Sequence, residues 1–198
     1  MSVGRQELLI QELELELLAL SESERQLTDD YLKNGYKSEV ARESLLDQTV
    51  PSGKTLEKYM KAAVNANFEG AEWSERVWKR QEQLRKVVKT EVTRALIRGE
   101  NGLTIARRIR KHMDASRTEA ERLAITEHAR VQTLAQESIM KENGFEHFKL
   151  MPESRACDIC KDIGKETEKN PVKISDMQIG TNAPPIHPYC RCAIVEVE

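Results

Sequence analysis

All four cysteines of this chain, and one of its four histidines, lie in the last quarter of the sequence. Cys157 and Cys160 are separated by two residues, and the run from His187 through Cys190 to Cys192 follows near the end of the chain. The first pair is short enough for both sulfurs to reach one ion from a single turn. Zinc favours four tetrahedral ligands drawn from thiolates and imidazoles. The two segments together therefore predict a structural zinc site.

Five donors compete for four positions around such an ion. We expect Cys157, Cys160, His187 and Cys190 to be the ligands, with Cys192 in reserve. In the alternative, all four cysteines bind the ion and His187 donates a hydrogen bond to one of them. The spacing leaves both arrangements open.

Other interpretations of the thiols are weaker. Disulfides would require an oxidising compartment, and a redox pair at Cys157 and Cys160 lacks a surrounding βαβ pattern. A catalytic zinc would keep one position open and place a general base nearby, for which Glu153 and Asp158 are available. The generous supply of ligands favours a closed, structural site. A metal would also stabilise a segment with few large apolar side chains.

The composition suits long, water-facing helices. Charged residues make up 32% of the 198 residues, aromatic residues only 5%, and the formal net charge is −2. Eight acidic and two basic residues fall within positions 1–30, whereas positions 76–111 hold twelve basic and three acidic residues. The basic stretch indicates a solvated helix surface or an acidic neighbour more than a DNA site, because no base-reading motif accompanies it.

Neither a secretory signal nor a membrane span is expected. The leucine-rich N-terminus carries four glutamates within its apolar run, which a signal peptide would not. No segment approaches the ~20 consecutive apolar residues of a spanning helix. We therefore expect folding in a reducing cytoplasm.

Hydrophobic periodicity predicts a mainly helical chain up to Gly144. Within it, Ser116 and Glu119 have the spacing of a capping box, which predicts a helix start at Ser116. Thr104 is expected to cap a short helix in which Ile105, Ile109 and Met113 share a face. The expected helices cover residues 8–21, 24–34, 38–48, 56–67, 73–98, 104–113 and 116–142.

After Gly144 the pattern changes to proline-rich loops between two β-type runs, residues 145–151 and 193–197. The predicted fold class is mainly α, a helical body with a small C-terminal α+β zinc-knuckle module of short antiparallel strands. We expect three parts: an N-terminal helical arm (residues 1–72), a helical core (73–144) and the Cys/His module (145–198).

A few other residues carry weaker signals. Glu127 and Arg130 have i,i+3 spacing and predict a structural ion pair. Trp73 and Trp78 are expected to be packing or interface anchors. His112, His128 and His147 lie apart from one another, as expected for surface or core residues rather than ligands.

A series of short motifs along the chain resembles, in the same order, those of the phage head-morphogenesis or minor capsid proteins, the group with the Mu-phage F-like domain. Its most specific part is the proline-flanked ending at residues 183–192, and one departure is Ile125, where family members generally carry an arginine. The series comprises residues 73–78, 96–99, 105–107, 120–127, 129–130, 143–144, the Cys157/Cys160 pair and residues 183–192.

The resemblance implies a non-enzymatic component of the virion head, assembled in the bacterial host cytoplasm. Such proteins sit near the portal in few copies and aid capsid assembly, DNA packaging or ejection. The implied partners are the portal and the major capsid or scaffolding proteins, with possible non-specific DNA contact. The alternatives are a zinc-dependent hydrolase or nuclease, since this domain also occurs fused to toxins, and a helical adaptor without metal.

Overall fold

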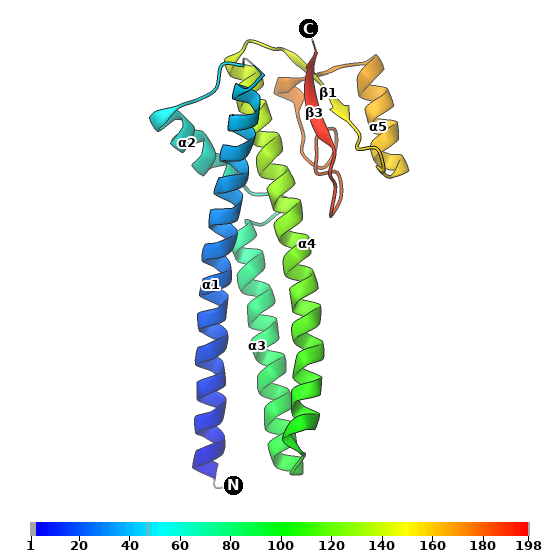
Figure 1. Ribbon diagram of the computed structural model, residues 1–198. Coiled ribbons are helices and arrows are strands. Elements are labelled where there is room, and N and C mark those ends of the chain that lie inside the picture. The colour runs from blue at the N-terminus through cyan, green and yellow to red at the C-terminus, as the bar shows by residue number, and fades with distance from the viewer. Residues whose placement is uncertain (1–2, 47, 198) are drawn as a thin grey trace. The chain divides into compact units, whose positions relative to one another are not determined.

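The computed structural model describes residues 3–46 and 48–197, and Figure 1 shows the helices and strands along the chain. Most of these residues are helical, and a small antiparallel sheet lies near the C-terminus, which confirms the predicted fold class. The elements are α1 (Val3–Ser44), α2 (Gly53–Val64), α3 (Trp73–Arg98), α4 (Gly102–Glu142), β1 (His147–Met151), α5 (Asp158–Lys169), β2 (Val172–Lys173), a 3-10 turn (Ile174–Asp176) and β3 (Ala193–Val197).

The chain divides into two compact units. Unit 1 comprises residues 1–28 and 71–121, and unit 2 comprises residues 29–70 and 122–198. Unit 2 contains all five cysteine and histidine candidates. The three-part division expected from the sequence stays a prediction.

Unit 1 is held together by an apolar seam from three helices. Leu84, Val88 and Val92 of α3 form its buried centre. The side chains that pack against them are Ile10, Leu13, Leu17, Leu96, Ile105 and Ile109. Met113, expected to share the face of Ile105 and Ile109, is instead 42% exposed.

The breaks predicted within α1 are wrong, because α1 runs unbroken from Val3 to Ser44 through the expected helices at residues 8–21 and 24–34 and most of the one at 38–48. Ser21 is buried inside it rather than ending it. Gly35 also lies within the helix, where a Cβ atom would come within 2.6 Å of the His128 ring. A glycine at this position thus permits close packing instead of ending the helix.

The helix start predicted at Ser116 is also wrong, because α4 runs unbroken from Gly102 to Glu142. The Ser116 hydroxyl accepts a 2.7 Å hydrogen bond from Nη1 of Arg80, so it bonds to a neighbouring helix rather than capping its own.

By contrast, α3 has the predicted bounds. It begins with a capping box between Glu72 and Glu75 and ends at Gly99, whose φ of 63° lies in the left-handed region.

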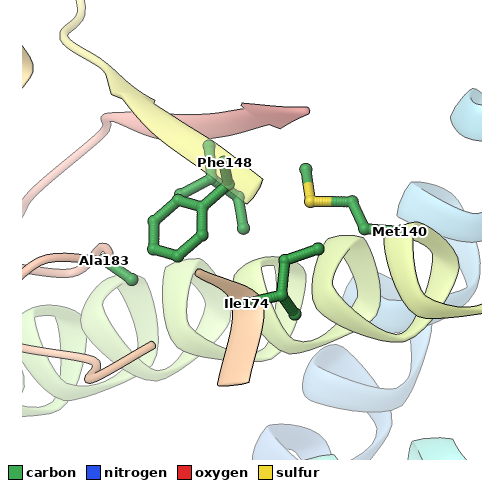
Figure 2. Close-up of a cluster of buried hydrophobic side chains, with 5 residues drawn as sticks. Met140, Phe148, Ile174 and Ala183 are labelled. Atoms are coloured by element: carbon green, nitrogen blue, oxygen red, sulfur yellow. The ribbon is translucent and has the colours of Figure 1, made fainter. Parts of the chain in front are cut away.

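Unit 2 contains a three-stranded sheet in the order β2-β1-β3, with both pairings antiparallel. Leu150 of β1 lies opposite Ile194 of β3. Figure 2 shows the apolar cluster beneath the sheet, where the Phe148 ring lies between β1 and α4, close to Ile174 and Ala183. The cluster fixes the sheet against the last turns of α4, where Met140 contributes to it.

Helix α5, which the sequence patterns did not predict, follows β1 and packs beside it (Figure 1). The helix packs tightly against the residue after β1 at Gly164, where a Cβ atom would lie 2.3 Å from Cγ of Pro152. Thr167 anchors the helix as well, because its Oγ1 accepts a 3.0 Å hydrogen bond from the backbone N–H of Leu150. Throughout the part of the chain that the structure describes, no helix is long and apolar enough to cross a membrane.

Candidate metal centre

The first candidate pair sits at the N-terminus of α5. Cys157 is the N-cap residue with an extended backbone (φ −66°, ψ 166°), and Cys160 lies in the first turn. The backbone N–H of Lys161 bonds to the carbonyl of Cys157 at 3.0 Å, which closes that turn. The sulfur of Cys157 is at the surface, whereas Cys160 is fully buried. One helical turn therefore aims both thiols at the same point, as the spacing predicted.

The second segment is the loop before β3. The backbone N–H of Cys190 bonds to the carbonyl of His187 at 3.1 Å and closes a tight turn. Tyr189, inside that turn, has a φ of 63°, a left-handed conformation uncommon for a residue with a side chain. Its backbone N–H donates a 3.3 Å hydrogen bond to Oγ1 of Thr126 on α4. Helix α4 thus supports the strained turn that positions His187 and Cys190.

The donor atoms of the two segments converge. Nε2 of His187 lies 3.3 Å from Sγ of Cys157 and 3.4 Å from Sγ of Cys160, and Sγ of Cys160 lies 3.8 Å from Sγ of Cys190. A regular zinc tetrahedron, with Zn–S of about 2.3 Å and Zn–N of about 2.05 Å, has edges of about 3.6 Å between sulfur and nitrogen and about 3.8 Å between sulfurs. The three separations lie within about 0.3 Å of these edges.

The imidazole of His187 is held in the tautomer that a metal needs. Its Nδ1 lies 2.8 Å from the carbonyl oxygen of Pro188. A carbonyl can only accept, so Nδ1 carries a proton, and in the neutral imidazole Nε2 then presents a lone pair toward the sulfurs of Cys157 and Cys160. An outer hydrogen bond of this kind is the usual way in which proteins orient a metal-binding histidine.

Without a cation, the pKa values of the thiols shift in different directions. The backbone N–H of Cys160 lowers the pKa of the Cys157 thiol, since it stabilises the thiolate. Burial raises the pKa of the Cys160 thiol, and the neighbouring Cys190 adds to the effect. Burial likewise raises the pKa of Cys192. Several thiolates in one buried cluster repel one another, so a fully deprotonated set requires a positive ion among them.

Two groups of donors have all their ligand atoms within 4.8 Å of one another, and they share one residue. The first contains Cys157, Cys160 and His187, and the second contains Cys160, Cys190 and Cys192. The five predicted residues are thus brought together and could hold a metal ion. Cys160 is common to both groups, whereas Cys190 and Cys192 are both grouped with Cys160 and not with His187. Whether His187 or Cys192 completes the ligand set stays a prediction.

The remaining candidates lie elsewhere. Asp158, considered as a general base, has a side chain that is 97% exposed and pairs with Lys161 at 3.6 Å. His128 stacks on Tyr31 with ring centroids 4.6 Å apart. His147 begins β1 and pairs with Val197. The role of Thr126 in holding the ligand loop was not predicted, because its partner lies 63 residues away.

The two tryptophans and the predicted ion pair can also be placed. Trp73 is buried and begins α3, as expected for a packing anchor, whereas Trp78 is 44% exposed. The Glu127–Arg130 ion pair is confirmed, with Nε of Arg130 donating to Oε2 of Glu127 at 2.7 Å.

Comparison with known proteins gives one family. The model of the phage Mu protein F like proteins matches residues 86–195, more than half of the 198 residues, and this span includes all five cysteine and histidine donors. No curated protein and no solved structure matches the chain. The extent of the family match confirms the resemblance drawn from the motifs, and the chain belongs to the phage Mu protein F like family.

Proposed function

We propose that this chain is a non-enzymatic minor head protein of a phage or prophage, with a structural zinc ion bound by Cys157, Cys160, His187 and Cys190. It would work in capsid assembly, at the portal, and in DNA packaging or ejection. The observation that supports this most is that Nε2 of His187 and Sγ of Cys190 both lie at tetrahedral spacing from Sγ of Cys160, within the region that the family shares. Its proposed partners are the portal and the major capsid or scaffolding proteins, and its proposed place is the virion head, assembled in the host cytoplasm.

A structural rather than catalytic ion is supported by the donors themselves. Four protein ligands fill a tetrahedral shell, and Cys192 is close enough to act as a fifth candidate. A hydrolytic zinc needs an open position and a nearby base. Glu153 and Asp158 are both exposed, and Asp158 pairs with Lys161. These features favour the structural role over a zinc-dependent hydrolase or nuclease.

The small core around the ligands supports a stabilising role for the proposed ion. Three of the four buried residues in this cluster, Cys160, Cys190 and Cys192, are cysteines, and Leu150 is the fourth. Thiols contribute little apolar area, so burial alone provides little free energy of folding here. An ion joining α5 to the loop before β3 would supply the missing stabilisation, as in other small metal-dependent modules.

Direct DNA contact is a secondary part of the proposed function. Of the twelve basic residues within positions 76–111, at least seven form ion pairs with other described residues: Arg80, Arg85, Lys86, Lys89, Arg94, Arg98 and Arg108. Their charges are largely neutralised by neighbouring glutamates. Any remaining contact with phosphates would be independent of base sequence and would weaken steeply with salt.

The test uses the full chain purified without chelators. Elemental analysis together with thiol titration should find about one zinc per chain and protected thiols. Negligible transition metal beside four free thiols would refute the metal centre. Pull-down with assembled portal rings, compared with duplex DNA at several salt concentrations, tests the head-protein role. Cleavage of DNA that is abolished by Cys157→Ser while the fold is retained would instead establish the nuclease.

A further inference from the structure

The N-terminal part of α1 carries a row of leucines that its own unit does not cover. Ile10, Leu13 and Leu17 pack into the core of unit 1. Leu8, Leu15 and Leu18 are 60%, 66% and 41% exposed. Their spacing of seven and three residues places them on one face of the helix. Exposed leucines grouped on one helix face are typical of an interaction site.

Acidic side chains flank this face. Glu7 and Glu12 are exposed and lie on either side of the leucine row. Residues 1–30 as a whole hold eight acidic and two basic residues. We call Leu8, Leu15 and Leu18, together with Glu7 and Glu12, the acidic stripe.

The first turns of α4, in the same unit, carry an exposed face of opposite charge. Ile105 and Ile109 pack inward, whereas Leu103 is 72% and Met113 is 42% exposed. Arg107 and Arg110 are exposed between them. Within the described residues neither arginine forms an ion pair, and Arg107 donates only a 3.4 Å hydrogen bond to the carbonyl of Leu103. We call Leu103, Arg107, Arg110 and Met113 the basic stripe.

We propose that the acidic stripe of one copy of this chain docks on the basic stripe of a second copy. The apolar residues at the two ends of each stripe, Leu8 and Leu18 in one and Leu103 and Met113 in the other, are ten residues apart. Ten residues span about 15 Å along a helix, so the apolar ends of the two stripes are at matching distances. The flanking glutamates of one copy would meet the arginines of the next. Complementary charges at the edge of an apolar helix contact are the pattern that selects partners in helical assemblies.

Two simpler pairings are disfavoured: acidic stripe with acidic stripe, and DNA with the basic stripe. Two acidic stripes facing each other would bring four glutamates together, which is destabilising. DNA on the basic stripe would account for Arg107 and Arg110 but would leave Leu103 and Met113 exposed. A contact between two different surfaces leaves one stripe free at each end of a dimer, so it builds a ring or an open filament. The inference is independent of the metal centre, since both stripes lie in unit 1 and the thiols lie in unit 2.

The experiment uses two full-length double variants. The first, Glu12→Lys with Leu15→Gln, removes the acidic stripe, and the second, Leu103→Gln with Arg110→Glu, removes the basic stripe. Lys79→Glu with Ile97→Gln is the matched control, because it changes an exposed charge and an exposed apolar residue of α3 outside both stripes. Circular dichroism establishes that each variant keeps its helices. Light scattering after size-exclusion chromatography then gives the mass of each species.

The natural sequence and the control should form concentration-dependent species larger than a dimer, which dissociate at high salt because the charges are screened. Each double variant alone should be monomeric, with an apparent affinity lowered at least about tenfold. An equimolar mixture of the two should form dimers and nothing larger, because each still offers the stripe that the other lacks.

Three results would overturn the inference. The first is a natural sequence that stays monomeric at all concentrations. The second is a basic-stripe variant that associates like the natural sequence, which would indicate contact between two acidic stripes. The third is a basic-stripe variant that loses DNA binding while its assembly is unchanged, which would identify that stripe as a phosphate-binding surface.

Discussion

Nε of Arg130 donates a 2.7 Å hydrogen bond to Oε2 of Glu127, and both side chains are only 1% exposed. The same guanidinium donates to the carbonyl oxygens of Ala63 and Val64 at 2.8 and 3.2 Å. These carbonyls belong to the last turn of α2, where a positive charge also complements the helix dipole. One buried cation therefore ties α4 to the end of α2 within unit 2.

Replacing Arg130 by Met should destabilise unit 2 strongly. The change leaves Glu127 as an unpaired buried carboxylate and removes the partners of two carbonyl groups. Breaking a buried ion pair in this way costs about 3–5 kcal/mol of the free energy of unfolding. Urea unfolding followed by circular dichroism measures the change. Arg122→Met, on an exposed site of the same helix, is the control and should cost far less. Equal effects of the two substitutions would contradict the assignment.

The Glu127–Arg130 pair shows what the sequence could reveal and what it could not. Its i,i+3 spacing predicted the ion pair, because that depends only on the geometry of one helix. Its burial depends on carbonyls more than sixty residues away, and no local pattern encodes that contact. The unbroken α1 was missed for the same reason. Glycine is common at helix ends, so a helix was expected to end before Gly35. Gly35 instead lies inside α1, where the absence of a Cβ atom lets the ring of His128 pack closely.

The candidate site divides in a similar way. The cysteine and histidine types and their spacing predicted which residues would cluster, since zinc chemistry restricts both. The helix and the hydrogen bond that hold the ligand-bearing segments in place were not predictable. Helix α5 has few apolar residues, and the hydrogen bond from Tyr189 to Thr126 joins two segments that have no shared motif.

Gly164→Ala should destabilise the contact between α5 and β1. The added Cβ atom would lie 2.3 Å from Cγ and 2.7 Å from Cδ of Pro152, whose ring cannot rotate away. Overpacking of this kind costs about 1–3 kcal/mol. Gly102→Ala is the matched control, since a Cβ atom there meets nothing within 4 Å and the residue opens α4. The control should be neutral or stabilising by up to about 1 kcal/mol. Thermal unfolding compares the two, and a Gly164→Ala protein as stable as the control would contradict the close packing.

His128 should make unit 2 less stable in mild acid. Burial lowers the pKa of its imidazole below the ordinary 6.5, and the hydrogen bond to Gln132 and the charge of Glu39 offset this only in part. The unfolded chain therefore takes up the proton first as the pH falls. The stabilisation is present above pH 6.5 and is lost as the pH falls through the lower pKa of the folded state.

The measurement is the free energy of unfolding from about pH 7 to about pH 5. In His128→Gln the decline should be smaller, since no proton is taken up at that site. The variant also loses the stacking on Tyr31 and so should be less stable at neutral pH. A pH dependence identical to that of the natural sequence would show that His128 does not contribute.

Cys160→Ser should abolish metal binding, whereas Cys192→Ser should retain it. Cys160 is buried and belongs to both groups of donors, while Cys192 is grouped only with the other buried thiols. We expect zinc affinity, measured by competition with a chelating dye, to fall more than about 100-fold in the first variant and at most about tenfold in the second. Ile159→Ser, at an exposed position of the same turn, controls for a general effect on α5.

His187→Ala distinguishes the ligand set that contains His187 from the one that contains all four cysteines. A protein that keeps zinc after His187→Ala but loses it after Cys192→Ser binds the ion with four cysteines, and the imidazole then only orients one of the thiolates.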